Sequence, residues 1–190
     1  MDTAACSSSE GYAGVVLTTP RMVLRAVRDD DLPALHRKIF GAADVMQWAF
    51  GGVALSLRES ESFIHAHMSP IPSPTGLAVV VDRSGGAVLG IAGLNPCAVL
   101  AADDLEIGFV LAREAWGRGL ATEIGRAQLR LGFEQLGRRR LLALAAAENI
   151  ASVHTLTKLG MQHHSEVRPA GRALRQVHCL DEEAWRTGSG

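Results

Sequence analysis

The chain has 190 residues, 47% of them hydrophobic, which is enough for one compact domain with a sizeable core. No apolar run approaches the roughly 20 residues that a membrane-spanning helix needs. Residues 1–14 lack the basic and apolar regions of a signal peptide, so we expect a cytoplasmic protein without a membrane partner. Nineteen basic and twenty acidic residues leave a net charge of −1, which argues against nucleic acid as a partner.

The cysteines and histidines show no pattern of a disulfide framework or a metal site. Cys6, Cys97 and Cys179 are widely spaced and form no CxxC pair, as is typical of reduced thiols. His65 and His67 are two residues apart on a predicted helix and therefore face different sides of it. We expect no bound metal.

The chain begins with a segment unlike the rest. Residues 1–16 are rich in Ser, Gly and Ala and are expected to form a flexible tail before a single domain at 17–187. Residues 22–26 alternate apolar and basic side chains, as a half-exposed strand does. A helix capped within Asp29–Asp31, with Pro33 in its first turn, and a second helix at 57–68 come next. Strands follow at 77–81, 87–94 and 105–111. The rest of the chain is predicted to form a helix from the turn at 116–121 to about 137, a strand at 141–145, a helix at 151–159, two weaker strands within 161–180 and a final turn at 182–185.

This order of elements indicates the fold class. Meandering strands come first and a strand–helix–strand–helix run follows, which predicts an α+β or mixed α/β domain rather than a doubly wound parallel sheet. Residues 82–86, Asp-Arg-Ser-Gly-Gly, are a hairpin signal, and Gly160 suits the C-cap of the helix at 151–159. The run Arg138 to Arg140 is expected to be a solvated charge run before a buried strand.

The most informative segment is Trp116-Gly117-Arg118-Gly119-Leu120-Ala121, which follows the strand at 105–111 after a short link. Two glycines at i and i+2 allow a tight turn and remove the Cβ atoms that would block a ligand. The free N–H groups and the dipole of the next helix favour an anion such as a pyrophosphate, and Arg118 adds a positive charge. Three interpretations remain open: a plain turn that starts a helix, a dinucleotide fingerprint whose third glycine is replaced by Thr122, and a CoA pyrophosphate site.

Five segments in order favour the third interpretation. They are 17–25 (LTTPRMVLR), 106–109 (EIGF), 116–123 (WGRGLATE), 148–152 (ENIAS) with 158–161 (KLGM), and 180–185 (LDEEAW). Together they resemble the GNAT-fold acetyltransferases, and in particular the Rim-type branch of ribosomal-protein N-terminal acetyltransferases. The similarity extends over residues 17–185.

The resemblance implies a mostly antiparallel sheet of six to seven strands, splayed in its middle and flanked by about four helices. It implies acetyl-CoA as the acyl donor, with backbone amides from about Gly117 to Thr122 holding its pyrophosphate and the strand at 105–111 pairing with its pantetheine arm. Trp116 departs from the Gln or Arg that opens this motif across the family but is usual in the Rim-type branch. The cofactor-binding residues implied are Phe109, Val110, Leu111, Trp116, Gly117, Arg118, Gly119, Leu120, Ala121, Thr122, Asn149 and Ser152.

Acetyl transfer to an amine needs a base, an oxyanion donor and an acid. Glu106 is the candidate base and would also contact the acceptor; its alternative role is that of a solvated strand residue or an ion-pair partner. By the same resemblance, the Val110 amide is the expected oxyanion donor. Ser152 is the candidate acid, because Leu156 stands where many family members carry a tyrosine and the one tyrosine of this sequence, Tyr12, lies in the predicted tail.

Two further residues have alternative roles. Trp48 is a candidate for lining the acceptor pocket, with core packing as the alternative. Asn149 suits the N-cap of the helix at 151–159 and can also contact the cofactor arm, because a capping side chain is able to bond a ligand as well.

These observations predict an acetyl-CoA-dependent N-acetyltransferase that works by direct transfer in a ternary complex. An α-amine, with a pKa of about 8, is partly neutral at physiological pH, whereas a lysine near 10.4 demands a stronger base. The expected acceptor is therefore a peptide N-terminus or a small-molecule amine. The alternative is a non-catalytic acyl-CoA-binding or regulatory domain, and both a monomer and a homodimer fit the sequence.

Overall fold

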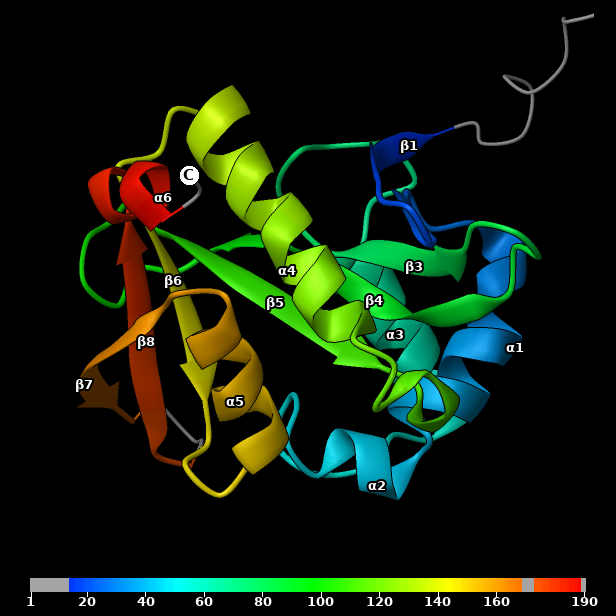
Figure 1. Ribbon diagram of the computed structural model, residues 1–190. Coiled ribbons are helices and arrows are strands. Elements are labelled where there is room, and N and C mark those ends of the chain that lie inside the picture. The colour runs from blue at the N-terminus through cyan, green and yellow to red at the C-terminus, as the bar shows by residue number, and fades with distance from the viewer. Residues whose placement is uncertain (1–13, 169–172, 189–190) are drawn as a thin grey trace, which may run out of the picture.

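The computed structural model describes residues 14–168 and 173–188, which form one eight-stranded sheet with helices on both of its faces (Figure 1). The strand order is β1-β2-β3-β4-β5-β6-β8-β7, and all neighbours are antiparallel except β5 and β6. The strands are β1 (Val15–Thr18), β2 (Met22–Arg25), β3 (Ala78–Asp82), β4 (Val88–Pro96), β5 (Leu105–Leu111), β6 (Arg140–Ala145), β7 (Gln162–Val167) and β8 (Arg175–Asp181). The helices are α1 (Leu32–Leu35), α2 (Ala43–Met46), α3 (Leu57–His67), α4 (Leu120–Arg130), α5 (Ile150–Lys158) and α6 (Glu182–Gly188).

The mixed α/β class is confirmed, but the predicted counts are too low. The described residues hold eight strands and six α-helices instead of six to seven strands and about four helices. The missed strand is β1, whose four residues are too few to show a pattern and whose start at Val15 lies ahead of the predicted domain start at 17. The helices α2 and α6 have four and seven residues, so a helical period has little room to appear in them.

β2 is an inner strand rather than the half-exposed strand that its alternation predicted. All four of its residues are buried, because β1 and β3 flank it and helices cover both faces. The basic residue of the pattern, Arg25, is buried against Asp31 through two hydrogen bonds of 2.7 Å. A bidentate carboxylate satisfies the charge of a buried guanidinium inside the protein. The alternating pattern alone would place this side chain in solvent.

The two faces of the sheet hold separate parts of the core. Val23 of β2 packs with α1 and α3 on one face, while Leu24 packs with α4 on the other. Figure 1 shows α4 and α5 crossing in front of the sheet and α3 behind it. The site described below lies at the middle of the sheet, between the helices of the two faces.

Local signals place the helices that border the site. Ser56 is the N-cap of α3: its hydroxyl accepts a hydrogen bond from the Glu59 N–H (3.3 Å), and its own N–H donates one to the Glu59 carboxylate (2.7 Å). Asn149 begins α5, as predicted, and its Oδ1 accepts a hydrogen bond from the Ser152 N–H at 3.2 Å. Gly160 follows α5 with a φ of 83°, which suits the predicted C-cap.

The prediction of a solvated charge run at 138–140 fits Arg139, which is exposed, but not its two neighbours. The Arg140 Nη2 lies 2.7 Å from Asp104 Oδ2, and the Arg138 Nη2 donates to the Asp103 carbonyl at 2.6 Å. Both arginines therefore fix the loop that leads into β5. Their partners lie in a loop more than thirty residues earlier in the chain, so no local pattern indicates the pairing.

The central feature of the sheet is the divergence of β5 from β6. The two parallel strands pair only at Leu105 with Leu141 and at Glu106 with Leu142. Beyond this point β5 remains paired with β4 alone, and Figure 1 shows β5 and β6 spreading apart toward the lower edge of the view. The sheet is therefore open at its middle, as the splayed arrangement in the sequence prediction requires.

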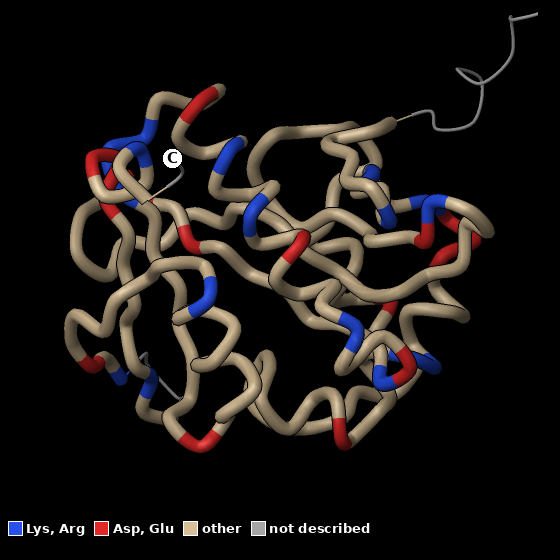
Figure 2. Tube along the Cα trace, in the orientation of Figure 1, with Lys and Arg blue, Asp and Glu red and all other residues tan. Residues whose placement is uncertain are grey.

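Charges are spread evenly over the described part of the chain. Figure 2 shows acidic and basic residues interspersed along the visible trace rather than gathered by sign. None of the helices in residues 14–168 and 173–188 has the length and apolar character to cross a membrane.

The β7–β8 edge contains a buried histidine that makes stability depend on pH. His178 is 4% exposed, and burial together with the neighbouring His163 lowers its pKa below 6.5. The unfolded chain therefore binds a proton at a pH where the folded chain does not, so folding stability decreases as the pH falls through about 6.5. We expect His178→Gln to show a shallower loss of melting temperature between pH 7.5 and 5.5 than the unmodified protein. His164→Gln, an exposed neighbour on β7, is the control, and parallel curves for all three proteins would contradict the prediction.

Candidate functional site

Two cavities meet where β5 and β6 separate. One has a volume of about 590 Å³ and lies on the side of α3, and the other, of about 440 Å³, runs along the start of α4 and α5. The two cavities share part of their walls, so a molecule bound in the first cavity would lie next to a molecule bound in the second. The shared residues are Trp48, Phe109, Val110, Leu144, Ser152 and Arg175.

The cavity along α4 and α5, termed here the donor groove, contains nearly all the residues predicted to bind a cofactor. Those in its lining are Phe109, Val110, Leu111, Trp116, Gly117, Gly119, Leu120, Ala121, Thr122, Asn149 and Ser152. Arg118 is the exception: it is exposed and is not among the lining residues. The structure thus brings together segments from β5, the glycine turn and α5 that are up to about forty residues apart in the chain.

The glycine turn has the backbone geometry of an open helix start. Gly117 and Gly119 have φ values of 69° and 74°, in the left-handed region that favours glycine. Gly119 is the N-cap of α4 without a side-chain cap, and the first helical hydrogen bond runs from the Glu123 N–H to its carbonyl at 3.1 Å. The amides of the first turn, including that of Ala121, therefore have no helical acceptor. A Cβ on Gly117 would meet no atom within 4 Å, and the residues of the first turn line the donor groove. Free amides at a helix start that borders a cavity favour an anion such as a pyrophosphate.

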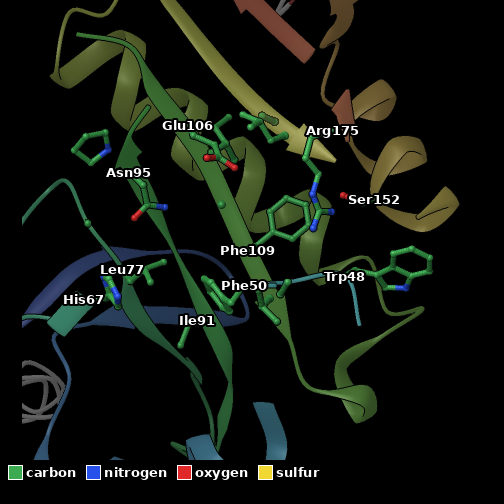
Figure 3. Close-up of a pocket in the computed structure, with 18 of the residues that line it drawn as sticks. Trp48, Phe50, His67, Leu77, Ile91, Asn95, Glu106, Phe109, Ser152 and Arg175 are labelled. Carbon is green, nitrogen blue, oxygen red and sulfur yellow. The ribbon is translucent and has the colours of Figure 1, made fainter. Parts of the chain in front are cut away.

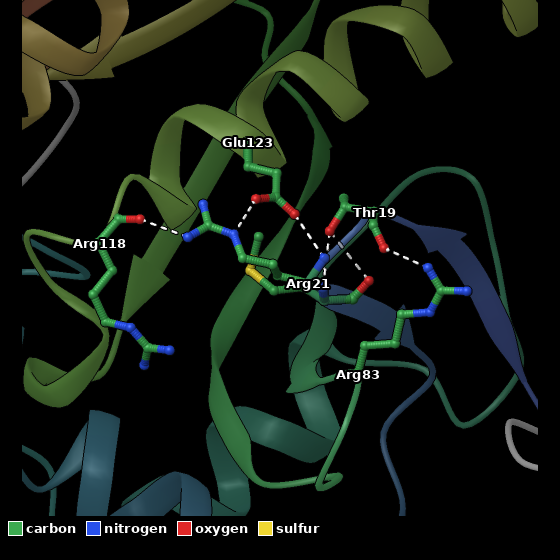
Figure 4. Close-up of polar contacts among 6 residues, drawn as sticks. Thr19, Arg21, Arg83, Arg118 and Glu123 are labelled. Atoms are coloured by element: carbon green, nitrogen blue, oxygen red, sulfur yellow. Dashed lines mark hydrogen bonds and ion pairs between the residues drawn. The ribbon is translucent and has the colours of Figure 1, made fainter.

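A salt bridge from the first hairpin holds the glycine turn in place (Figure 4). Arg21 lies between β1 and β2, and its Nε is 2.6 Å from Glu123 Oε2 in the first turn of α4. Its Nη1 donates to the Arg118 carbonyl at 2.8 Å. Burial would raise the pKa of Glu123, but hydrogen bonds from Thr19 and Arg21 hold it below its ordinary value. Because the Arg118 carbonyl points toward Arg21, the N–H of the same planar peptide unit, that of Gly119, points away from it.

This bridge leads to a prediction about donor binding. We expect Arg21→Ala to raise the KM for acetyl-CoA about tenfold, because the Gly119 amide is no longer oriented toward the pyrophosphate. A tenfold change is the size expected when one hydrogen bond to a charged group is lost. Stability should change by less than about 1 kcal/mol, since the exposed pair is screened by solvent. Acetyl-pantetheine, which lacks the pyrophosphate, should give an unchanged KM. Arg21→Lys tests for partial rescue, and an equal loss with both donors would contradict this role.

The cavity on the α3 side, termed here the acceptor cavity, contains the candidate base. Glu106 of β5 is half-buried and lies opposite Asn95 of β4, and both side chains border this cavity (Figure 3). Burial, followed by the negative charge of Glu106, raises the pKa of the Cys97 thiol to about 11. Cys97 is therefore a protonated thiol at neutral pH. Cys97 and Cys179 are free thiols, as expected from the sequence, and Cys6 lies outside the described residues.

The backbone of β5 presents alternate residues to β4 and to the open edge of the donor groove. Ala112 N–H donates to the Leu89 carbonyl at 2.8 Å, and the register with β4 is constant along β5. The N–H of Val110, two residues earlier, therefore points to β4 as well. The amides that face the open edge are those of Phe109 and Leu111. The Val110 amide, expected to be the oxyanion donor, therefore does not face the donor groove, because the sequence does not reveal the phase of the strand.

Trp116 closes the end of this open edge. Its Nε1 donates to the Leu111 carbonyl at 2.7 Å, while the ring stays 44% exposed and borders the donor groove. The Arg113 guanidinium lies 5.7 Å from the ring centre. Trp116 therefore satisfies a backbone carbonyl that β6 leaves unpaired, which gives a structural reason for tryptophan at the start of the motif.

The start of α5 supplies Ser152 to both cavities. Its N–H is used by the Asn149 cap, whereas its side chain borders the space between Phe109 and the acceptor cavity. Leu156, one turn later, is 2% exposed and borders the acceptor cavity without offering a proton. Asn149 borders the donor groove while capping the helix, so both roles predicted for it are compatible.

Trp48 lies at the junction of the cavities rather than in the core. It is 37% exposed and borders both cavities, so the core-packing alternative is wrong. Phe50, in the same loop, has a φ of 48° and packs against Phe63 with ring centres 4.7 Å apart. A non-glycine residue in this conformation costs about 1 kcal/mol or more, and packing against α3 holds it beside the acceptor cavity.

Sequence reasoning missed several residues of the site. Asn95, His67 and Arg175 border the acceptor cavity, and Lys158 borders the donor groove. Lys158 belongs to a segment that the sequence does single out, so the motif contains a signal for it. Arg175 has none, because only the placement of β8 beside β6 brings the start of this strand to the open middle of the sheet.

Comparison with protein families identifies the class of this site. A family model described as an acetyltransferase (GNAT) domain matches residues 21–162. The uncharacterized protein YkkB of Bacillus subtilis (strain 168) is 29% identical over 153 residues, which cover 80% of this chain and 88% of YkkB. The range matched by the family model contains the glycine turn, Glu106 and Ser152.

Solved structures share the fold at low sequence identity. An acetyltransferase (GNAT family) from Bacillus anthracis superposes with a TM-score of 0.74 at 20% identity and covers 87% of this chain and 98% of its own. A spermidine N-acetyltransferase from Vibrio cholerae, in complex with CoA and spermine, has a TM-score of 0.67 at 19% identity, with 87% and 98% covered. A putative ribosomal-protein-serine acetyltransferase from Vibrio cholerae gives 0.67 at 18% identity, with 88% and 97% covered.

Proposed function

Because the chain belongs to the GNAT acetyltransferase family and is an acetyl-CoA-dependent acyltransferase, we propose that it acetylates a primary amine by direct transfer in a ternary complex. The observation that carries this proposal is the meeting of the two cavities at the point where β5 leaves β6. The anion-binding turn lies in one cavity and a carboxylate lies in the other. Donor and acceptor therefore reach the same shared wall from opposite sides, without a covalent enzyme intermediate.

On the donor side the protein supplies backbone groups. The amides from Gly117 to Thr122 bind the pyrophosphate of acetyl-CoA, and the open edge at Phe109 and Leu111 pairs with its pantetheine arm. Acetyl-CoA contributes an activated thioester carbonyl at this position. One of the two open-edge amides then donates a hydrogen bond to the oxygen on which negative charge develops.

On the acceptor side Glu106 removes the proton from the amine, directly or through a water, so that the nitrogen lone pair can attack the thioester carbon. The C–N bond forms and the C–S bond breaks. The nitrogen then loses its second proton, which is relayed through the Ser152 hydroxyl or a water to the departing thiolate, so that the serine ends protonated as it began. Trp48 borders the cavity where the acceptor approaches. Glu106 suits this role because it lies in the cavity next to the shared wall and on the strand that carries the oxyanion donor.

The acceptor that we propose is the α-amine of a peptide or a small amine of similar basicity. An amine with a pKa of about 8 is partly neutral at physiological pH, so one carboxylate suffices as base. The segments similar to the Rim-type branch and the superposition on a putative ribosomal-protein-serine acetyltransferase support a peptide N-terminus. A cytoplasmic location, and a monomer or homodimer, stay predictions.

The proposal is tested by thiol release from acetyl-CoA in the presence of N-terminal peptides and small amines. We expect at least one acceptor to raise thiol release well above hydrolysis, with an N-acetylated product visible by mass spectrometry. If CoA binds at micromolar concentrations but no acceptor raises turnover, the chain is an acyl-CoA-binding domain without transferase activity.

A further inference from the structure

Arg175 is a cation of the site for which the proposed transfer chemistry has no use. It is half-buried at the start of β8 and belongs to the wall shared by both cavities. Figure 3 shows its side chain extending toward Phe109, with Ser152 beside it. Within residues 14–168 and 173–188, the structure gives the Arg175 side chain no ion pair or hydrogen bond.

An arginine in this position is available to a ligand. A guanidinium carries five donors in a planar fork that matches a carboxylate, and it stays charged at any physiological pH. Arg140, on the neighbouring strand β6, already has its carboxylate at 2.7 Å, whereas Arg175 faces a cavity. The contrast indicates that the partner of Arg175 arrives with the substrate.

The other charges of the acceptor cavity narrow the substrate class. Its lining contains one carboxylate, Glu106, and one permanently charged base, Arg175. A polyamine or an aminoglycoside would bring several cations, of which Glu106 could face one while Arg175 would repel the others. An acceptor with one amine and one anionic group matches both residues.

We propose that Arg175 binds a carboxylate of the acceptor, so that the preferred substrate is an amine carrying a carboxylate nearby. The inference rests on the proposed function, since it assigns the charge pattern of the amine that Glu106 deprotonates. Two sources share this chemistry: a small amino acid with its own carboxylate, and a peptide with an acidic side chain next to its N-terminus. Arg175 is in either case a specificity-determining residue that touches the substrate.

The experiment compares acceptors that differ only in this charge. One pair is glycylglycine and its amide, small α-amines with a pKa of about 8 that differ in a free carboxylate. The other pair is the peptide amides Ala-Glu-Ala and Ala-Gln-Ala, and the amines are chemically alike within each pair. We expect the acid of at least one pair to have a kcat/KM about tenfold or more above its neutral partner, as for a hydrogen bond to a charged group. The preferred pair identifies the source of the carboxylate.

Variants of Arg175 show whether this residue causes the preference. Arg175→Gln should lower kcat/KM for the acid about tenfold, leave that for the neutral partner within about twofold, and leave the KM for acetyl-CoA unchanged. Arg175→Lys should restore part of the preference. Arg168→Gln removes the same charge from an exposed position at the end of β7 that borders neither cavity, and it should retain the full preference. Melting temperatures establish that each variant is folded.

The outcomes separate this inference from the proposed function. Acetylation of acids and neutral partners with equal efficiency overturns the role of Arg175 but leaves the transferase intact. A higher KM for acetyl-CoA in Arg175→Gln, with every acceptor affected alike, assigns Arg175 to the donor and also overturns the inference. Absence of acetylation with every acceptor, despite CoA binding, refutes the proposed function itself.

Discussion

Gly119→Glu should reduce CoA affinity by at least about 100-fold, which corresponds to roughly 2.7 kcal/mol. Gly119 has a φ of 74°, which side chains rarely adopt, and a Cβ there would lie 3.7 Å from Arg21 Nη2. A glutamate at this position therefore strains the turn and competes with Glu123 for the guanidinium that holds it. The added carboxylate also repels the pyrophosphate in a site where both charges are partly desolvated. Titration calorimetry with CoA measures the loss.

The control variant introduces the same backbone strain and the same charge at a glycine that lies away from both cavities. Gly137 has a φ of 60°, is exposed, meets no atom within 4 Å at its Cβ position and borders neither cavity. Gly137→Glu should therefore cost about 1–2 kcal/mol of stability, as for any residue forced into the left-handed region, and leave CoA affinity unchanged. Gly119→Ala should fall between the two. A folded Gly119→Glu protein with normal CoA affinity would remove the turn from the binding site.

Glu106→Gln is expected to lower kcat about 10²- to 10⁴-fold, the usual contribution of a general base. The KM for acetyl-CoA should stay within about twofold, because Glu106 lies in the acceptor cavity and not in the donor groove. Glutamine keeps the shape of the side chain and removes only its ability to accept the proton. Steady-state rates at saturating acceptor, measured from pH 6 to 10, test this expectation.

The pH profile distinguishes loss of a base from loss of packing. Without a base the amine must lose its proton to solvent, so the activity of Glu106→Gln should recover at high pH as the free amine becomes neutral. A structural defect would reduce the rate by the same factor at every pH. Glu134→Gln, an exposed position that borders neither cavity, serves as the matched control. Activity equal to that of the unmodified protein across the range would exclude Glu106 as the base.

Some parts of the fold were predictable because their causes are local. β5 was predicted at Leu105–Leu111, the bounds found in the structure, since its apolar residues end abruptly at the turn. Asn149 and Gly160 mark the ends of α5 through capping preferences that involve only a few neighbouring residues. The glycine turn was predicted to be an anion site from a signal that is equally local, the two glycines at the start of a helix.

Other parts depend on long-range contacts that a sequence does not display. The burial of Arg25 required knowledge of both flanking strands and of its pairing with Asp31. Amides alternate in direction along β5, so a shift of one residue in the β4–β5 pairing decides whether the Val110 amide faces β4 or the groove. Arg175 lies at the site because β8, and not β7, is the neighbour of β6 in the sheet, although β7 comes before β8 in the chain.

The two-residue pairing of β5 with β6 also affects the protein before any reaction occurs. The open stretch of β5 is an unpaired strand edge inside the sheet, and unpaired edges promote association with other chains. In the proposed complex the pantetheine arm of acetyl-CoA becomes the missing neighbour of β5. A ligand that binds only the folded chain stabilises it in proportion to the logarithm of its concentration. The supply of acetyl-CoA would thus govern the lifetime of the folded protein as well as its rate of turnover.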